Sequence, residues 1–478
     1  MTARCVMVLG TTSGAGKSWL ATALCRWYAR QGLKVAPFKA QNMSNNARVV
    51  GGGEIGSAQY FQSLAARAVP DVRMNPLLLK PERDTHSQVV LLGQVDEALT
   101  RASWRGRSAS VWPWVAQALD ELRQDNEVLV IEGAGSPAEI NLRGSDIVNM
   151  RVAHHANAAC LLVTDIDRGG AFAHLYGTWA LLEEADRARI RGFVLNKFRG
   201  DPALLAPAPQ QLARLTGVPT IATLPMLWRH GLPEEDGWYG GGGAAGTGQG
   251  KTIAIVAYPR ISNLDEFQPL ANLPGVRLVW ARTPGDLAGA DWVVLPGSKN
   301  TTGDLAWLRA QGLGRAVAGH AAAGGAVLGI CGGLQMLGEA LIDVHGIDGN
   351  APGLGLLPLV TQFEPAKTVS RTEARFGAVT GPWSALAGAR VAGYEIHHGQ
   401  TAQHPAMAPA REVLAGGLGW QNAQGNVLGL YLHGLFEEPM VLQALFGASA
   451  PTLETVFDGL ADFIDTHFTA GVLAGLIA

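Results

Sequence analysis

The sequence predicts an α/β fold built from two doubly wound domains. Short, continuously apolar runs such as "RCVMVLG", "EVLVIEG" and "GFVLNKF" alternate with longer helical patterns, and such runs are typical of parallel strands covered on both faces of a sheet. The alternation stops at "GWYGGGGAAGTGQG" and restarts with "KTIAIVAY", "DWVVLPG" and "AVLGICG". Because a glycine run cannot hold a packed element, we interpret this stretch as a linker between the two domains.

The length of the chain agrees with this division, because 478 residues are too many for one ordinary hydrophobic core. We expect a first domain over residues 1–235, a glycine-rich linker over 236–250, a second domain over 251–445 and a helical tail over 446–478.

Composition excludes several classes of function. The net charge is -3 and the sequence contains no basic block, so we expect no nucleic-acid partner. No apolar run approaches the ~18 residues of a membrane span, and we expect no membrane association. The four cysteines lie far apart without a CxxC pair, which argues against zinc or disulfides and for the reducing cytoplasm. The sequence does not indicate an oligomeric state.

The first apolar run leads into a phosphate-binding loop. In "VMVLGTTSGAGKSWL" the Gly16-Lys17-Ser18 end matches the motif in which backbone N–H groups cradle phosphates, Lys17 neutralises them and the Ser18 hydroxyl reaches magnesium. The usual loop has four residues between its glycines, whereas five lie between Gly10 and Gly16, with Thr11 in place of the first glycine. The loop therefore predicts ATP binding by a variant of the motif.

The longer phosphate loop distinguishes between two classes of nucleotide-binding protein. Switch ATPases of the ParA/MinD kind carry an extra lysine four residues before the second glycine, and Thr12 stands there in this chain. With Gly14 inside it, the longer loop resembles that of dethiobiotin synthetase-like enzymes, which phosphorylate a carboxylate.

Magnesium needs a carboxylate at another strand end, and Glu132 in "VLVIEGAGS" meets this requirement. Glu54 in "GGGEIGSAQ" is a second candidate ligand, with a structural role as the alternative. Asn196 and Lys197 in "VLNKF" follow a late strand. In the nucleotide-binding family such an Asn-Lys pair lies near the base, and a surface turn is the alternative.

In the second domain, "AVLGICGGLQMLG" reads as an apolar strand, a cysteine, small residues and a helix. This G-x-C-x-G pattern is the cysteine form of a nucleophile elbow, in which glycines relieve crowding and Cys331 meets a helix N-terminus. The N–H of Gly332 and the strand-end residues Gly297 and Ser298 are the predicted oxyanion donors. Gln335, one helical turn further on, is expected to help hold a glutamine substrate.

A cysteine nucleophile needs a base, and His433 follows the apolar run in "VLGLYLHGLF". A cysteine followed by a histidine about 100 residues later resembles the order in class I glutamine amidotransferases. His397 and His398 in "GYEIHHG" compete for the role, but we interpret that stretch as a substrate-facing loop.

The residue that orients the histidine cannot be assigned from the sequence. The usual third member of such a site is a glutamate two residues after the histidine, where this chain has Leu435. Glu395, Glu437 and Glu438 are nearby in sequence. Either another group orients His433 or the two residues act as a dyad.

Nearly the whole chain resembles the cobyric acid synthase family of cobalamin biosynthesis. The resemblance rests on "GTTSGAGKS", "FKAQNMSNN", "SQVVLLG", "EGAGSPAEINL", "TDIDRGG", "NKFRGD", "LPGSKNT", "GICGGLQMLG" and "GYEIHHG", in that order. It implies that glutamine is hydrolysed through a thioester at Cys331 and that ATP and magnesium activate a carboxylate as an acyl phosphate. It further implies that ammonia then amidates side chains b, d, e and g of adenosylcobyrinic a,c-diamide.

Polar residues at strand ends of the first domain are candidate corrinoid contacts, with turn capping as the alternative for each. They are Gln41, Asn42, Asn45, Asp84, Gln88, Asp165 and Asp167. Two rival functions are a nucleotide-dependent binding switch with an inactive glutaminase-like domain, and a ligase that amidates another acid, such as cobyrinic acid or a cell-wall lipid glutamate.

Overall fold

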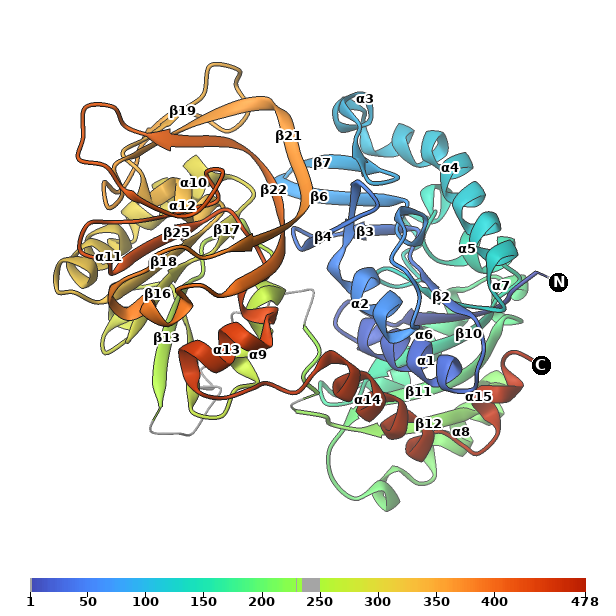
Figure 1. The fold of residues 1–478 in the computed structure, drawn as a ribbon. Helices are drawn as coiled ribbons and strands as arrows, with labels where there is room; N and C mark the ends of the chain where they lie inside the picture. Colours follow the sequence, from blue (N-terminus) through green and yellow to red (C-terminus); the bar gives the residue numbers. More distant parts are fainter. Residues whose placement is uncertain (1, 229, 234–249) are drawn as a thin grey trace.

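A computed structural model describes residues 2–228, 230–233 and 250–478. The predicted glycine-rich linker, 236–250, lies outside the described residues except for Gly250. Figure 1 shows two α/β lobes side by side, the first blue to green and the second yellow to orange.

A six-stranded parallel sheet forms the centre of the first lobe, in the order β12-β11-β10-β1-β9-β2. Alternate residues of β1 face opposite sides, with Val6 and Val8 in one core and Met7 and Leu9 in the other. Both faces are therefore covered, which explains the continuously apolar strand sequences. The strands are β1 (Arg4–Gly10), β2 (Val35–Phe38), β9 (Val128–Glu132), β10 (Ala159–Asp165), β11 (Ile190–Phe198) and β12 (Thr220–Pro225).

The helices of the first lobe divide between the two faces of this sheet. Residues of α1 and α2 belong to one core, and residues of α4, α5, α6 and α8 belong to the other. The helices are α1 (Lys17–Arg30), α2 (Ser57–Ala65), α3 (Glu97–Arg101), α4 (Trp104–Asp125), α5 (Met150–His155), α6 (Ala171–Leu181), α7 (Glu184–Arg187) and α8 (Ala208–Thr216).

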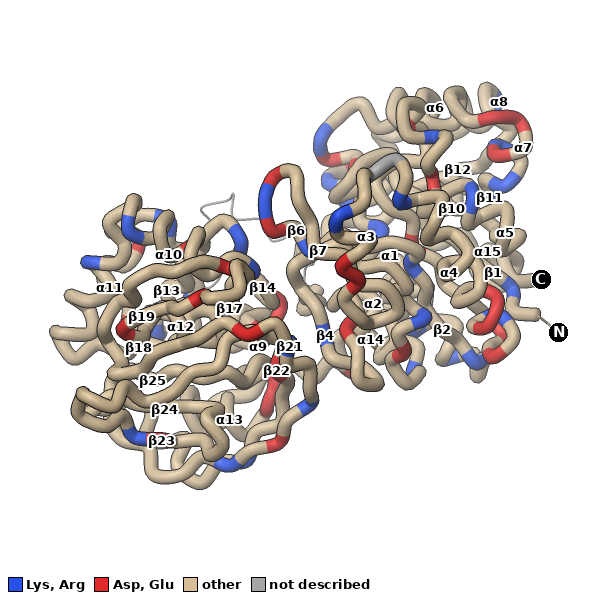
Figure 2. Tube along the Cα trace, turned by 90° about the horizontal axis from the view of Figure 1, so that it is seen from above, with Lys and Arg blue, Asp and Glu red and all other residues tan. Residues whose placement is uncertain are grey.

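Two small sheets extend the first lobe towards the second (Figure 1). They are β3 (Gln41–Met43) with β6 (Leu77–Arg83), β7 (His86–Leu91) and β8 (Gln94–Val95), and the hairpin of β4 (Ala47–Val50) with β5 (Gly53–Gly56). Figure 2 shows charged residues gathered at the tip of the β6–β7 hairpin, between the lobes.

The second lobe has a seven-stranded sheet in the order β15-β13-β16-β18-β25-β24-β23, parallel except at β24 and β23. Its strands are β13 (Lys251–Val256), β15 (Val276–Ala281), β16 (Trp292–Leu295), β18 (Ala326–Ile330), β23 (Arg411–Leu414), β24 (Gly419–Gln421) and β25 (Val427–Leu430). Its helices are α9 (Gln268–Ala271), α10 (Thr301–Ala310), α11 (Leu313–Ala322), α12 (Gly332–Leu337) and α13 (Pro439–Phe446).

Two further sheets complete this lobe and face the first lobe in part. One pairs β14 (Ile261–Ser262) with β17 (Gly297–Ser298). The other contains β19 (Ala340–Ile342), β20 (Ala351–Pro352) and the long antiparallel pair β21 (Leu359–Arg375) and β22 (Arg390–Gln403). In Figure 1, β21 and β22 lie beside the small sheets of the first lobe.

The predicted tail is helical and returns to the first lobe. Helix α14 (Leu453–His467) packs on α1, and α15 (Val472–Gly475) follows it (Figure 1). The buried Arg26 of α1 forms an ion pair of 2.8 Å with Glu454, and the Tyr28 hydroxyl donates to the carbonyl of Leu473 at 2.8 Å. The C-terminal segment is therefore part of the first lobe's core. No helix among the described residues is long and apolar enough to cross a membrane.

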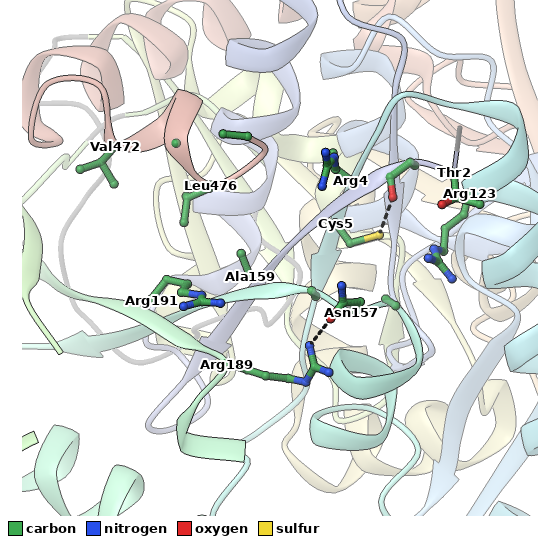
Figure 3. A pocket seen from close by; sticks show the side chains of 15 residues that line it. Thr2, Arg4, Cys5, Arg123, Asn157, Ala159, Arg189, Arg191, Val472 and Leu476 are labelled. Atoms are coloured by element: carbon green, nitrogen blue, oxygen red, sulfur yellow. Dashed lines mark hydrogen bonds between the residues drawn. The ribbon is translucent and has the colours of Figure 1, made fainter. Parts of the chain in front are cut away.

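A cavity of about 790 Å³ opens at the amino ends of the strands in the first lobe. Figure 3 shows four arginine side chains around it, Arg4, Arg123, Arg189 and Arg191, together with residues of α15. Because the phosphate loop follows the opposite, carboxyl end of β1, this cavity is separate from the sites described next.

Candidate active sites

Cys331 occupies a sharp turn between β18 and α12. Its backbone angles are φ 50° and ψ -106°, an uncommon conformation for a residue with a side chain, and it is the N-cap of α12. A Cβ on Gly333 would lie 1.8 Å from the carbonyl oxygen of Leu295, and one on Gly332 would lie 2.8 Å from the amide nitrogen of Ser298. The local fold is thus the strained elbow that the glycine pattern predicts.

The close approach of Gly332 to Ser298 places two predicted oxyanion donors beside each other. The Ser298 hydroxyl is held by Asp304, to which it donates at 2.6 Å, and this bond fixes the short strand β17. The arrangement is compatible with an oxyanion hole, although the roles of Gly297, Ser298 and Gly332 stay predictions.

His433 is fully buried at the end of β25 and contacts the predicted nucleophile. Its Nδ1 lies 3.0 Å from Oε1 of Glu266, which is also buried, and the second carboxylate oxygen accepts from the Gly434 N–H at 3.1 Å. Burial lowers the pKa of His433, but the charge of Glu266 and hydrogen bonding with Cys331 outweigh it and raise the pKa above its usual range. Cys331, His433 and Glu266 thus lie together and comprise the residue types of a Cys-His-Glu catalytic triad.

Glu266 was missed by sequence reasoning, which considered only glutamates near His433 in the chain. Of those, Glu395 contacts His397 at 3.1 Å, Glu437 pairs with Arg48 and Glu438 accepts from the Ala392 N–H. Neither a dyad nor any of these three glutamates describes the site. The 3₁₀ turn Leu264–Phe267 carries Glu266 to the histidine, and no strand-end signal marks that turn in the sequence.

The stretch "GYEIHHG" was expected to form a loop, and that expectation is wrong. It lies within β22, where His397 is opposite Thr368 of β21. Nδ1 of His397 contacts the Gly399 carbonyl at 2.8 Å, and Nδ1 of His398 contacts the Glu364 carbonyl at 3.1 Å. The described hydrogen bonds of these two histidines do not include Cys331, and the role of His433 as the base stays a prediction.

Gln335 is buried in α12 behind the elbow. Its Oε1 accepts from the Thr301 hydroxyl at 3.2 Å, and its Nε2 donates to the Tyr431 hydroxyl at 3.3 Å. These bonds hold the amide within the domain, so its predicted contact with substrate glutamine stays a prediction.

In the first lobe, the phosphate loop connects β1 to α1. Gly14 and Gly16 have φ of 71° and 98°, which a residue with a side chain adopts only at a cost, and a Cβ on Gly16 would lie 2.1 Å from Asn196 Nδ2. The Lys17 side chain lies over the loop, and its Nζ donates to the carbonyls of Thr12 and Gly135, both at 3.1 Å. The lysine is therefore directed at the place where phosphates would lie.

Ser18 and Glu132, the predicted magnesium ligands, are adjacent. The Ser18 hydroxyl donates to Oε1 of Glu132 at 2.8 Å, Lys39 donates to the same oxygen at 2.8 Å, and Gln62 donates to Oε2 at 2.6 Å. Burial raises the pKa of Glu132, but the charge of Lys39 and these hydrogen bonds together hold it below its usual range. Sequence reasoning missed Lys39 and Gln62, which keep the carboxylate ionised and oriented.

Glu54 lies in a different environment from Glu132. Its two carboxylate oxygens pair with Lys80 at 2.7 Å and with Lys367 of the second lobe at 2.5 Å. Burial would raise the pKa of Glu54, but the charges of Lys367 and Lys80 hold it well below its usual range. Because two ammonium groups already neutralise it, these contacts favour a role in joining the lobes over the predicted role as a metal ligand.

The Asn-Lys pair also reaches the phosphate loop. Asn196 donates to the carbonyl of Ala15 at 2.8 Å, and Lys197 donates to the carbonyl of Gly14 at 2.9 Å. Lys197 also pairs with Asp165 at 3.1 Å, and Asp167 follows on the same loop with Arg199 as its partner. Asp165 therefore lies close to the phosphate loop through Lys197, and the predicted corrinoid role of both aspartates stays a prediction.

The other corrinoid candidates lie on or beside the small sheets between the lobes. Asp84 pairs with Arg260 at 2.5 Å, and Gln88 accepts from Lys299 at 3.1 Å. Asn42 is buried and donates to Gln59 at 3.2 Å, while Asn45 donates to the Pro81 carbonyl at 3.1 Å. Gln41 is half-buried at the start of β3. Their contact with a corrinoid stays a prediction.

The fold and the two sites define a two-domain amidotransferase, in which a nucleotide-binding domain is joined to a cysteine-dependent glutaminase domain. Residues 6–236 match the family described as the CobQ/CobB/MinD/ParA nucleotide binding domain, and residues 252–441 match the CobB/CobQ-like glutamine amidotransferase domain.

Full-length relatives identify the family. The chain is 76% identical over 479 residues to a cobyric acid synthase of Variovorax paradoxus (strain S110), with all of both chains covered. It is 73% identical over 485 residues to a cobyric acid synthase of Polaromonas naphthalenivorans (strain CJ2), again with both chains fully covered. The chain belongs to the cobyric acid synthase family.

Proposed function

We propose that this chain is an ATP-dependent, glutamine-hydrolysing ligase that amidates side chains b, d, e and g of adenosylcobyrinic a,c-diamide to give cobyric acid. The observation that carries the proposal is the pairing of two sites in one chain: Cys331, His433 and Glu266 in one lobe, and the phosphate loop with Ser18 and Glu132 in the other.

The glutaminase half follows from the geometry of the triad. His433 accepts the thiol proton of Cys331, and the sulfur attacks the side-chain amide carbon of glutamine. His433 then donates the proton to the leaving nitrogen as the carbon–nitrogen bond breaks. Ammonia is released, and the glutamyl group stays bound to Cys331 as a thioester. Water activated by His433 then releases glutamate. Glu266 stabilises the imidazolium that forms in each half-reaction, because its carboxylate lies 3.0 Å from Nδ1.

The synthetase half makes a carboxylate reactive towards ammonia. A carboxylate oxygen attacks the terminal phosphorus of ATP, ADP leaves, and ammonia displaces phosphate from the acyl phosphate to give an amide. Lys17 and the loop N–H groups neutralise the phosphates. The Ser18 hydroxyl and the Glu132 carboxylate are hard oxygen donors of the kind Mg²⁺ takes, and they would hold the ion, which supplies charge neutralisation at the phosphates.

The substrates meet between the lobes, where the corrinoid candidates Asp84 and Gln88 contact Arg260 and Lys299 of the glutaminase lobe. The corrinoid side chains would then lie on the path from one site to the other. We place the enzyme in the cytoplasm, since all four cysteines are free thiols.

Mass spectrometry of the corrinoid product tests the proposal directly. The purified protein is incubated with adenosylcobyrinic a,c-diamide, ATP, Mg²⁺ and glutamine, and the amides added are counted. Four additions are expected. Amidation of cobyrinic acid or of a lipid-linked glutamate in place of the diamide would identify a related ligase. An absence of glutamine hydrolysis would favour the nucleotide-dependent binding switch.

A further inference from the structure

Both nitrogens of His433 contact one short segment, Asn263–Glu266. Glu266 contacts Nδ1, and the side-chain nitrogen of Asn263 lies 3.3 Å from Nε2. Asn263 is buried and has φ 54° and ψ 37°, a left-handed conformation that asparagine tolerates better than most residues with a side chain. The orientation of the base therefore depends on what fixes this segment.

The segment is fixed by β4 of the other lobe. The side-chain oxygen of Asn263 accepts from the Ala47 N–H at 3.0 Å, and the Leu264 N–H donates to the side chain of Asn46 at 3.0 Å. Arg48 donates from Nε to Oδ2 of Asp265 at 3.0 Å, and a second guanidinium nitrogen also contacts that oxygen. Three successive residues, Asn46 just before β4 and Ala47 and Arg48 at its start, thus hold three successive residues of the segment.

Arg48 is the centre of this contact. It is fully buried, and it also pairs with Glu437 at 2.6 Å, just beyond His433 in the chain. Its guanidinium lies 5.0 Å from the ring centre of Tyr394, and that ring is stacked on the imidazole of His433 at 5.2 Å and 18°. Arg48 therefore supports His433 from a second side, through an aromatic ring.

Removing Arg48 would leave several carboxylates close together. One carboxylate oxygen of Asp265 is buried without a hydrogen-bond partner, and the other is bound by Arg48. Among the described contacts, Arg48 is therefore the main group that neutralises the buried charge of Asp265. Asp265 adjoins Glu266, and Glu437 is near both. Buried acids without their cation are costly, and the protein can relieve this cost by protonation of a carboxylate or by movement of the segment away from β4.

We infer that the start of β4 in the nucleotide-binding lobe is a positioning element of the glutaminase. The Ala47 N–H holds Asn263 and Arg48 holds Asp265, and these contacts keep His433, directly and through Glu266, in the orientation needed to act on Cys331. The inference rests on the glutaminase part of the proposed function. Glutamine hydrolysis then requires the two lobes to be docked, which limits the release of ammonia to an enzyme whose synthetase lobe is in place.

The test compares Arg48→Ala and Arg48→Lys with Arg371→Ala. Arg371 also joins the lobes through β4, donating to the Val49 carbonyl at 3.2 Å, but it does not contact the Asn263–Glu266 segment. Glutamate release is measured at several glutamine concentrations, and corrinoid amidation is measured separately with ammonium salt. The Arg48 variants should lose about 10- to 100-fold in kcat for glutamine, the loss expected for a misplaced catalytic group, with KM changed less than about threefold. Ammonia-dependent amidation should be retained, and Arg371→Ala should resemble the wild type.

Three results would overturn the inference: glutamine hydrolysis at the wild-type rate in Arg48→Ala, an equal loss of glutamine- and ammonia-dependent activity in the Arg48 variants, or an equal loss in Arg371→Ala. If Arg48→Ala fails to fold, Asn263→Ala decides the question, because it removes the bond to Ala47 without leaving a buried charge. This variant should also lose kcat for glutamine, and a normal kcat would refute the inference. Glutamate release can be measured without corrinoid amidation. If the corrinoid is not the substrate, the amidation assay will show this, and the test of Arg48 will be unaffected.

Discussion

The imidazole of His433 is oriented by Glu266, whose carboxylate oxygen lies 3.0 Å from Nδ1 although the two residues are 167 positions apart in the chain. Glu266 lies in the turn after β14, and because it contacts Nδ1, the other ring nitrogen, Nε2, points away from the carboxylate. The glutaminase constellation is therefore assembled from both ends of its domain.

Replacement of this glutamate tests the assignment. Glu266→Gln keeps the shape but removes the charge that stabilises the imidazolium, so kcat for glutamine hydrolysis should fall by about 10- to 1,000-fold, less than or equal to the loss seen when a triad acid is neutralised in proteases. Glutamate release measures the effect. Glu395→Gln is the matched control, because Glu395 contacts His397 and not His433; if both variants behave alike, Glu266 is not the third member.

Separation of the two sites leads to a second prediction. Cys331→Ala removes the thioester step and nothing at the phosphate loop, and alanine is small enough for the elbow. The variant should lose glutamine-dependent amidation but keep amidation with ammonium salt, and this rescue should improve as pH rises because more ammonia is unprotonated. His433→Ala should behave in the same way.

The opposite pattern is expected for Lys17→Ala, which should lose amidation with either nitrogen donor because acyl phosphate formation precedes nitrogen attack. Amide formation is measured by mass spectrometry for each donor. Efficient use of glutamine by the Cys331 variant, or of ammonia by the Lys17 variant, would contradict the assignment of the steps to separate lobes.

Magnesium dependence tests Glu132. A neutral amide binds a hard cation poorly, so Glu132→Gln should raise the Mg²⁺ concentration needed for half-maximal amidation by about tenfold or more. Glu127→Gln is a suitable control, since Glu127 is exposed near the start of the same strand and accepts from the Lys34 N–H at 2.7 Å. Identical magnesium titrations for the wild type and Glu132→Gln would show that Glu132 is structural.

Stability should depend on pH through Asp304, which supports the predicted oxyanion strand. Burial raises the pKa of Asp304 to about 7, against the opposing hydrogen bonds from Ser298 and Arg260. The folded state therefore binds this proton more tightly than the unfolded state does, and stability from this group falls as pH rises from about 4 to about 7.

The side chain of the Asp304→Asn variant cannot ionise, so the variant does not lose this part of its stability as pH rises. The difference in unfolding free energy, variant minus wild type, should therefore increase by more than ~1 kcal/mol between pH 4 and pH 8, since one pKa unit corresponds to about 1.4 kcal/mol. Denaturant unfolding at both pH values measures the difference. Parallel behaviour of the two proteins would mean that Asp304 titrates normally.

Features encoded in local patterns could be predicted from the sequence, and features set by tertiary contact could not. The elbow at Cys331 depends on glycines beside it, and the phosphate loop depends on glycines before Lys17, so both appear as short motifs. Glu266 lies in "NLDEF", which resembles any acidic turn, and a tertiary contact between the two ends of its domain brings it to His433. The β22 stretch does not resemble a strand in the sequence, because its histidines and glycines hide the alternation of a long antiparallel strand.

The helical tail shows the same limit. The spacing of Val456, Leu460 and Ile464 predicts an apolar helix face, but nothing in that spacing says which lobe it will cover. Packing on α1 decides it, through partners such as Arg26 that precede the tail by most of the chain.

That return of the tail changes how the glutaminase lobe can move. Since the chain leaves the first lobe after β12 and comes back to it at α14, the second lobe is anchored at both of its ends, like an insertion into a single larger domain. A lobe joined to the rest of the protein at both ends of its chain can move less freely than a lobe joined at one end. The site that produces ammonia therefore stays at a high local concentration relative to the site that uses it. Deletion of the chain from α14 onward would remove one attachment of the glutaminase lobe and would also uncover part of the first lobe's core.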